Sequence, residues 1–272
     1  MAPNSTGDHA VHALRFEHGV LRNSHDPLTV ELPLQIKING QPFSVTMRTP
    51  GADQSLVKGL LFTEGIALAD NGACILHEER DPTTGTVLAV NVEIPPMYLC
   101  ENVYAKRSLL ASAACGLCGQ RELDAAGFDT RPLAPAGKLQ LTRVESLIAS
   151  MRAQQQTFAA TGSTHAAALF RLEGGTPLCV FEDIGRHNAV DKAVGFLLEQ
   201  QRLGEAQVLT VSGRISFEIV SKSYKAGIPF LLAVSAPSSF AVDMGQRWGM
   251  TVIGYCRDQR CTVYCNPDNV TV

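Results

Sequence analysis

The second half of the chain alternates short apolar segments with amphipathic ones, and this alternation limits the possible folds more than any other feature of the sequence. Strands are predicted at 207–211, 230–234 and 251–255, with helices at 217–224 and 241–247 between them. Strands that alternate with helices form a mainly parallel sheet that the helices cover. The sequence therefore predicts an α/β domain whose mixed, mainly parallel sheet lies between two layers of helices.

Three further elements are predicted just before this alternation. The segments 167–172 and 177–182 flank Gly174-Gly175, which is a turn signal, and are expected to form a β-hairpin. The segment 188–200 is predicted as a helix because its apolar residues recur on one face. Another helix is expected at 142–158.

The first half of the chain is β-rich. Strands are predicted at 28–38, 41–48 and 86–94. Asn39-Gly40, between the first two strands, is a strong hairpin signal. A helix is predicted at 54–64, with Asp53 as its N-cap.

Residues 1–25 are polar and are expected to form an irregular, flexible tail with exposed histidines. The predicted organisation has three parts: this tail, a β-rich N-terminal domain over 26–123, and a second domain over 124–272.

Composition excludes several classes of protein. The net charge of −3 argues against a broad nucleic-acid surface, and no segment is apolar enough to predict a membrane span. The N-terminus has neither a basic nor an apolar signal region, so a cytoplasmic location with reduced cysteines is expected. Charged residues make up only 18% of the chain, which favours an oligomer interface.

The predicted parallel strands also indicate where a ligand would bind, because ligands of such sheets lie outside the carboxyl ends of the strands. The segments that leave these ends are 182–188, 212–216, 235–239 and 256–260. They carry Arg186, Arg214, Arg257 and Arg260, whose guanidinium groups match phosphate. Together the four segments predict a pocket for a phosphorylated ligand, although each alone could be an ordinary turn.

Cys115-Gly-Leu-Cys118 places two thiols close together, and three chemistries are open to them. They could form half of a zinc site, completed from Cys256, Cys261 and Cys265. They could be a redox dithiol, although the pair does not follow an early strand of a small α/β unit. They could carry sulfur as a persulfide, for which flanking glycines at 116 and 119 supply freedom of movement. A structural role as small buried apolar residues is a fourth possibility.

A zinc deaminase is not expected. That chemistry needs a His-x-Glu motif, and the chain has Ala167 where the glutamate should follow His165.

Several long motifs lie between about Arg48 and Tyr264. They are RTPG at 48–51, GLLFTEG at 59–65, ACGLCG at 114–119, TGSTHAAALF at 161–170, EDIGRHNAVDK at 182–192, SGRISFE at 212–218 and AVSAPSS at 233–239. On these motifs the chain resembles the formate dehydrogenase accessory sulfurtransferases, the FdhD family.

The resemblance implies that the chain is a sulfurtransferase with a cytidine-deaminase-like second domain. Cys115 would carry sulfur as a persulfide, received from a cysteine desulfurase, and Cys118 would assist or relay it. The acceptor would be the molybdenum bis(molybdopterin guanine dinucleotide) cofactor of formate dehydrogenase, the client enzyme. A homodimer is implied, and no structural metal is expected.

The resemblance also implies which residues bind the cofactor. The family's binding segment falls on Tyr255, Cys256, Arg257, Asp258, Gln259 and Arg260, and further candidates are Ser212, Gly213 and Arg214. Asp183, Arg186, His187 and Asn188 could also serve the pocket, but Asp183 and Asn188 could equally be helix caps. Two other functions stay open: a cofactor-binding chaperone without sulfur transfer, and a zinc-stabilised binding module.

Overall fold

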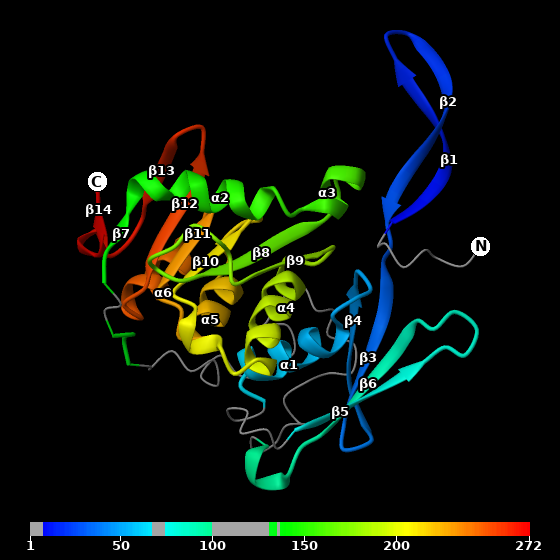
Figure 1. Cartoon of the computed structure of the whole chain (residues 1–272), viewed down its shortest axis with the longest axis horizontal. Helices are drawn as coiled ribbons and strands as arrows, with labels where there is room; N and C mark the ends of the chain where they lie inside the picture. The colour runs from blue at the N-terminus through cyan, green and yellow to red at the C-terminus, as the bar shows by residue number, and fades with distance from the viewer. Residues whose placement is uncertain (1–7, 67–73, 100–130, 135–136) are drawn as a thin grey trace.

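The computed structural model describes residues 8–66, 74–99, 131–134 and 137–272 of the chain. In chain order these residues form a projecting two-stranded hairpin, a four-stranded sheet with one helix, and a six-stranded sheet between helices (Figure 1).

The six-stranded sheet has a parallel centre. Its parallel strands are β10 (Val208–Val211), β11 (Phe230–Ala233) and β12 (Thr251–Arg257). The antiparallel strands are β8 (His165–Phe170), β9 (Cys179–Asp183) and β13 (Arg260–Val263), and the strand order is β13-β12-β11-β10-β8-β9. The predicted mixed sheet is confirmed, and so is the hairpin of β8 and β9. β13 was not predicted, and it adds a third antiparallel pairing at the edge.

Helices cover both faces of this sheet (Figure 1). One face packs against α4 (Arg186–Glu199), α5 (Phe217–Lys225) and α6 (Ser239–Arg247), and the other against α2 (Val144–Arg152). Every residue of β10 and β11 is buried. Leu209 and Val211 face the α4 side while Val208 faces the α2 side, as the period of two along a strand requires.

The single helix predicted at 142–158 is two helices in the structure. α2 ends at Arg152, and α3 (Gln156–Thr161) begins after a turn. The Glu182 carboxylate accepts hydrogen bonds of 2.8 Å from the backbone N–H groups of Thr157 and Phe158. A side chain from β9 therefore accepts hydrogen bonds from the unpaired N–H groups at the start of α3. The local sequence around α3 could not reveal this partner.

The N-terminal sheet has the order β4-β3-β6-β5. Its strands are β3 (Leu32–Ile38), β4 (Gln41–Arg48), β5 (Ile75–Arg80) and β6 (Val87–Glu93). Asn39 and Gly40 have φ values of 51° and 77°, so the predicted turn is confirmed. β5 was not predicted, because this edge strand is polar and largely exposed.

The predicted helix after β4 is confirmed as α1 (Asp53–Thr63), but the role expected of Asp53 is wrong. Ala52 occupies the N-cap position with φ 53°. The Asp53 carboxylate instead accepts a 2.6 Å hydrogen bond from Arg48 Nε, and the Arg48 side chain is fully buried. The carboxylate thus neutralises a buried guanidinium rather than capping the helix.

The prediction of an irregular tail is wrong for residues 8–25, and residues 1–7 lie outside the described part of the chain. β1 (Asp8–Glu17) and β2 (Val20–Thr29) form an antiparallel hairpin that projects from the body (Figure 1). Histidines and arginines interrupt its apolar residues, and no core covers it. Leu14, Phe16 and Leu21 are 69%, 68% and 64% exposed, so the strand signal from burial is missing.

Short elements complete the described chain. β7 (Leu139–Gln140) pairs with β14 (Val270–Thr271) and joins the start of the second domain to its end. Single 3₁₀ turns lie at Pro96–Tyr98, Leu141–Arg143, Leu203–Glu205 and Pro267–Asn269. Among the helices described, none has the length and apolarity needed to cross a bilayer.

The two sheets are joined by a close crossing of α1 and α4 at two glycines. A Cβ atom added to Gly59 would lie 1.9 Å from the Asp191 carbonyl oxygen, and one added to Gly195 would lie 1.8 Å from that of Ser55. Backbone therefore packs directly on backbone at both positions, and any larger residue would force the helices apart.

We predict that Gly195→Ala lowers the free energy of unfolding by about 3 kcal/mol or more, because neither backbone can retreat from the added methyl group. Gly204→Ala is the matched control, since nothing lies within 4 Å of its added Cβ. Urea unfolding measures both variants. An equal, small effect of the two substitutions would show that the crossing tolerates separation.

Candidate functional site

The segments predicted to form a ligand pocket do lie along one edge of the six-stranded sheet. β9, β10, β11 and β12 all end at this edge, where the loops 183–186, 212–216 and 235–238 begin. We call this edge, together with the β12–β13 turn, the rim. With neighbouring strands about 4.8 Å apart, the rim from β12 to β9 spans roughly 19 Å.

Backbone hydrogen bonds connect the loops of the rim. Ile215 N–H donates to the Ala236 carbonyl at 3.1 Å, and Ser238 N–H donates to the Ile215 carbonyl at 2.9 Å. Tyr255 N–H donates to the Ser235 carbonyl at 3.1 Å. The three loops after the parallel strands are therefore held in register, which favours a preformed surface.

His165 lies at the rim between two arginines. A Cβ atom on Gly213 would be 3.2 Å from His165 Nδ1 and 3.5 Å from Arg186 Cβ, so the glycine permits this close approach. Burial, followed by the charges of Arg186 and Arg214, lowers the pKa of His165, which is therefore neutral at pH 7. His165 was noted in the sequence only for lacking its glutamate partner.

Two helix N-termini lie at the rim. α4 and α5 begin after Gly185 and Ser216, and in the described chain neither start is capped by a side chain. Arg186 Nε and Ser216 Oγ are both buried atoms without a hydrogen-bond partner. The exposed side chain of Arg214 adds a second guanidinium. The positive end of a helix dipole and the guanidinium groups together suit an anion such as phosphate.

Of the predicted trio 212–214, the serine has a structural partner. Ser212 Oγ accepts a 2.9 Å hydrogen bond from Ala166 N–H. What these three residues offer to a ligand at the rim is therefore the side chain of Arg214 and the close approach to the backbone of Gly213. The hydroxyl of Ser212 instead stabilises the sheet.

The segment 255–260 differs from the loop that the sequence suggested. β12 continues to Arg257, Asp258 and Gln259 form a tight turn with φ 54° and 55°, and Arg260 begins β13. Tyr255 has φ 54° at a register shift in the ladder. The tip is thus a hairpin whose exposed side chains include both arginines.

Cys256 is the exception within this segment, because its side chain is 1% exposed and packs in the core on the α2 side. Burial raises its pKa to about 12. Cys265 lies in the core on the opposite side of the sheet, so it cannot share a metal with Cys256. Within the described residues no three His, Cys, Asp or Glu side chains are grouped to hold a metal ion.

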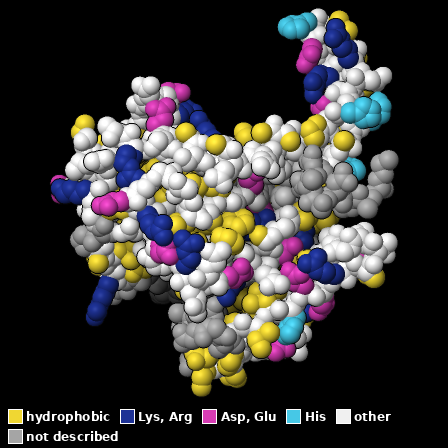
Figure 2. Space-filling model, in the orientation of Figure 1, with side chains coloured by type: hydrophobic (Ala, Val, Ile, Leu, Met, Phe, Trp, Pro, Cys, Tyr) yellow, Lys and Arg dark blue, Asp and Glu magenta, His cyan; other side chains and the backbone are white. Residues whose placement is uncertain are grey.

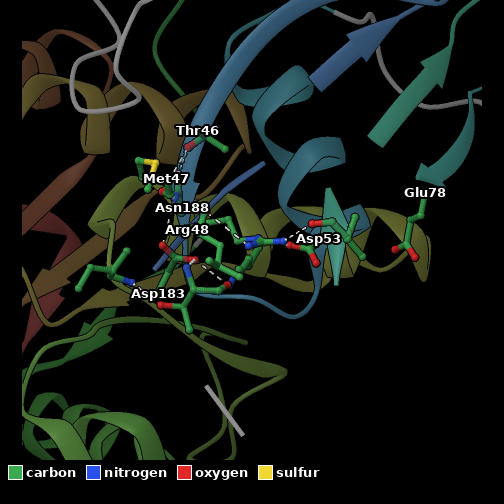
Figure 3. Close-up of polar contacts among 12 residues, drawn as sticks. Thr46, Met47, Arg48, Asp53, Glu78, Asp183 and Asn188 are labelled. Atoms are coloured by element: carbon green, nitrogen blue, oxygen red, sulfur yellow. Dashed lines mark hydrogen bonds and ion pairs between the residues drawn. The ribbon is translucent and has the colours of Figure 1, made fainter. Parts of the chain in front are cut away.

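Asp183 and Asn188 hold the two sheets together instead of facing a ligand (Figure 3). Asp183 Oδ2 pairs with Lys192 Nζ at 2.7 Å and accepts a 3.1 Å bond from Thr49 N–H. Asn188 Nδ2 donates to Asp183 Oδ1 and to the Met47 carbonyl at 3.0 and 2.8 Å. Both side chains are buried, so neither serves the pocket and neither caps α4.

A second buried cluster lies where α1 ends beside α4 and α5. Lys222 Nζ lies 2.9 Å from both Asp191 carboxylate oxygens and 3.0 Å from Glu64 Oε1. It also donates to Thr63 Oγ1 at 2.9 Å. Although burial opposes its charge, the two carboxylates raise the pKa of Lys222, and the residue remains an ammonium.

His187 adjoins this cluster and is 5% exposed. Its Nε2 has no hydrogen-bond partner and lies 4.0 Å from Glu218 Oε2. Burial, assisted by Lys222 and Arg186, lowers the pKa of His187 to about 4. The side chain is therefore a neutral structural residue beneath the rim.

A cavity of about 480 Å³ lies away from the rim, between the start of α1 and the β5–β6 turn. Its charged groups already have partners. Asp53 is paired with Arg48, Glu78 with Arg80, and Glu199 accepts a hydrogen bond from Ser55.

The predicted sulfur carriers Cys115 and Cys118 lie outside the described residues.

Protonation of His187 should contribute to acid unfolding. The imidazole of His187 is protonated near pH 6.5 in the unfolded chain but only near pH 4 in the folded chain. The free energy of unfolding therefore falls as the pH falls through this window. We predict that His187→Gln removes about 2 kcal/mol of the stability difference between pH 7 and pH 4.5. Urea unfolding at both pH values measures it. His9→Gln, at an exposed position, should leave the difference unchanged, and an unchanged difference in His187→Gln would contradict the assignment.

Comparison with known proteins places the fold and the motifs in one family. The model of the FdhD/NarQ family matches residues 29–271. The sulfur carrier protein FdhD of Nocardia farcinica is 45% identical over 247 residues, covering 88% of this chain and 86% of the relative. The protein of the same name from Mycobacterium tuberculosis is 41% identical over 256 residues, covering 90% and 92%.

The structural similarity is equally extensive. A crystal structure from Desulfotalea psychrophila, described as a formate dehydrogenase accessory protein, superposes with a TM-score of 0.75. It covers 97% of this chain and 99% of its own, and at 20% identity it shows the shared fold. The family match and the curated relatives cover most of the sequence, and this chain therefore belongs to the FdhD/NarQ family.

Proposed function

We propose that this chain is a sulfur carrier that serves formate dehydrogenase, with Cys115 as the thiol that holds the sulfur. The names of the curated relatives and the two-cysteine motif of the sequence support this proposal. The Cys115 thiolate attacks the outer sulfur of a persulfide on a cysteine desulfurase. A new S–S bond forms, the donor's S–S bond breaks, and the donor cysteine leaves as a thiolate. Cys118 assists or relays this sulfur.

The four described cysteines of the second domain support the choice, because each has a raised pKa. Burial raises the pKa of Cys179 and of Cys256 to about 12, and it also raises the pKa of Cys261 and Cys265. The thiolate is the nucleophile in sulfur exchange, so these four thiols are poor carriers at neutral pH. They are structural residues of the second domain.

The acceptor in this proposal is the bis(molybdopterin guanine dinucleotide) cofactor, bound along the rim as cargo. The observation that carries the proposal is the pair of uncapped helix starts beside the unpartnered Arg186 Nε and Ser216 Oγ. Arg214 lies in the same part of the rim, while Arg257 and Arg260 lie at the tip of β12 and β13. A long ligand with phosphates in both halves suits cationic groups spread along this edge. Tyr255, Asp258 and Gln259 are exposed candidates for its other groups, and the buried Cys256 is not.

We also propose that the protein is cytoplasmic, since persulfide chemistry needs reduced thiols. A homodimer is proposed because charged residues make up only 18% of the chain. A cofactor-binding chaperone without sulfur transfer would use the same rim. The two functions differ only in whether the cysteines are required.

We predict that incubation with a cysteine desulfurase and cysteine adds one sulfur atom to the peptide that contains residues 115–118. Cys115→Ala should lose the added sulfur and fail to restore formate dehydrogenase activity. Cys261→Ala is the control, because the pKa of its thiol is raised and it should behave as the parent. Peptide mass spectrometry measures the first result. Full maturation of formate dehydrogenase by a Cys115→Ala/Cys118→Ala variant would establish the chaperone instead.

We predict that Arg214→Gln and Arg260→Gln each weaken the binding of GDP, used as a probe for one cofactor half, by about 10-fold or more. Arg22→Gln, on the distant hairpin, keeps the same change of net charge and should leave binding unaltered. Calorimetric titration at fixed salt measures the three affinities. Equal weakening by all three variants would indicate general attraction of charge and no site at the rim.

A further inference from the structure

His12 and His25 lie directly opposite each other on the projecting hairpin. They are partners in the register of β1 and β2, and their ring centroids are 4.4 Å apart with the planes tilted by 53°. Both side chains are exposed, and in the part of the chain that is described no hydrogen bond occupies either ring.

The hairpin places its arginines on the other face. Successive residues of a strand alternate between faces, so Ala10, Leu14 and Phe16 share the face of His12. Arg15 belongs to the opposite face, where it pairs with Asp26 at 2.7 Å and lies 3.9 Å from Glu17. Arg22, the register partner of Arg15, shares that face. No cationic side chain of the described hairpin therefore stands beside the two imidazoles. Figure 2 shows histidine, basic and acidic side chains together on this projecting arm.

We propose that His12 and His25 bind a divalent transition-metal ion such as Zn²⁺. Imidazole nitrogen is a preferred ligand of zinc, nickel and copper. With Zn–N bonds of about 2.0–2.1 Å, two nitrogens on one tetrahedral ion are about 3.3 Å apart. Rings whose centroids are 4.4 Å apart can supply that spacing by rotation about the side-chain bonds. Residues on adjacent strands are also held at a fixed separation, so little freedom is lost on binding.

Within the described residues the site has two protein ligands, because no group of three or more metal-binding side chains is found there. Water would complete the coordination. A site of this kind binds and releases its ion readily, unlike the closed four-ligand sites of structural zinc.

The ion would stabilise the register of the hairpin. An isolated pair of strands is marginally stable in water, and β1 and β2 form a sheet of their own. An ion that binds only when His12 faces His25 stabilises that pairing in proportion to its occupancy. The metal would thus order an arm that exposes Leu14, Phe16 and Leu21.

The test is a calorimetric titration of the full chain with ZnCl₂. It is done in a Cys115→Ser/Cys118→Ser background, because a Cys-x-x-Cys pair would bind zinc itself. One ion per chain is expected, and His12→Gln and His25→Gln should each lower the affinity by about 10-fold or more. His9→Gln is the control, since His9 lies on the same hairpin but on the opposite face.

Binding that is unchanged in His12→Gln and His25→Gln would overturn the proposal, as would an equal loss in His9→Gln or no binding by the parent. The ring resonances of His12 and His25 provide a second readout by NMR. They should shift together as one equivalent of Zn²⁺ is added, and a shift of one ring alone would also contradict a shared ion.

Discussion

The contact of α1 with α4 at Gly59 and Gly195 is the constraint on which the rest of the structure depends. Two backbones touch there, so the first sheet and the second domain are held at a fixed distance and angle. In this position two threonines of the first half donate hydrogen bonds to carboxylates of the second. Thr49 N–H donates to Asp183, and the Thr63 hydroxyl donates to Asp191. Four buried charged residues of the second domain then find a partner in the first: Asp183, Asp191, Lys192 and Lys222. Without the close crossing, Asp183 and Lys222 would lose partners and remain buried, which is costly for a charged group.

The polar side chains at the junction have hydrogen-bond or ion-pair partners within the protein, and the rim differs in this respect. Asp183, Lys192 and Asn188 are fully engaged within the protein, whereas Arg186 Nε, only a few residues away, has no partner. The same motif in the sequence, 182–192, thus contains residues of two kinds. Its carboxylate and amide groups hold the halves together, and its one arginine, Arg186, faces the edge where a ligand would lie. Proximity in sequence says little about which residues share a role, because successive positions at a strand end and a helix start point in different directions.

The cysteines separate in a similar way. Cys256 and Cys265 are close in sequence but lie in the cores on opposite sides of the sheet, so they form no common site. Burial raises the pKa of both thiols, and with it that of Cys179 and Cys261. The second domain therefore uses cysteine as a small apolar residue. The sulfur chemistry proposed for this chain uses Cys115 and Cys118, which lie outside the described residues.

The sequence by itself determined the elements that bury one face or both. The apolar runs at 207–211 and 230–234, the helical period after Asn188 and the Asn39-Gly40 turn were all predicted correctly, because burial and backbone conformation leave a local pattern. The sheet order then placed the four loop segments, three of which carry arginine, on one edge. The exposed hairpin of β1 and β2 and the polar edge strands β5 and β13 leave no such pattern, and they were missed.

Only the tertiary structure decided that Asp53 neutralises Arg48, that Asp183 joins two sheets and that Cys256 is buried. Each of these roles is set by contacts that form when the chain packs, with partners that include residues more than a hundred positions away in the sequence.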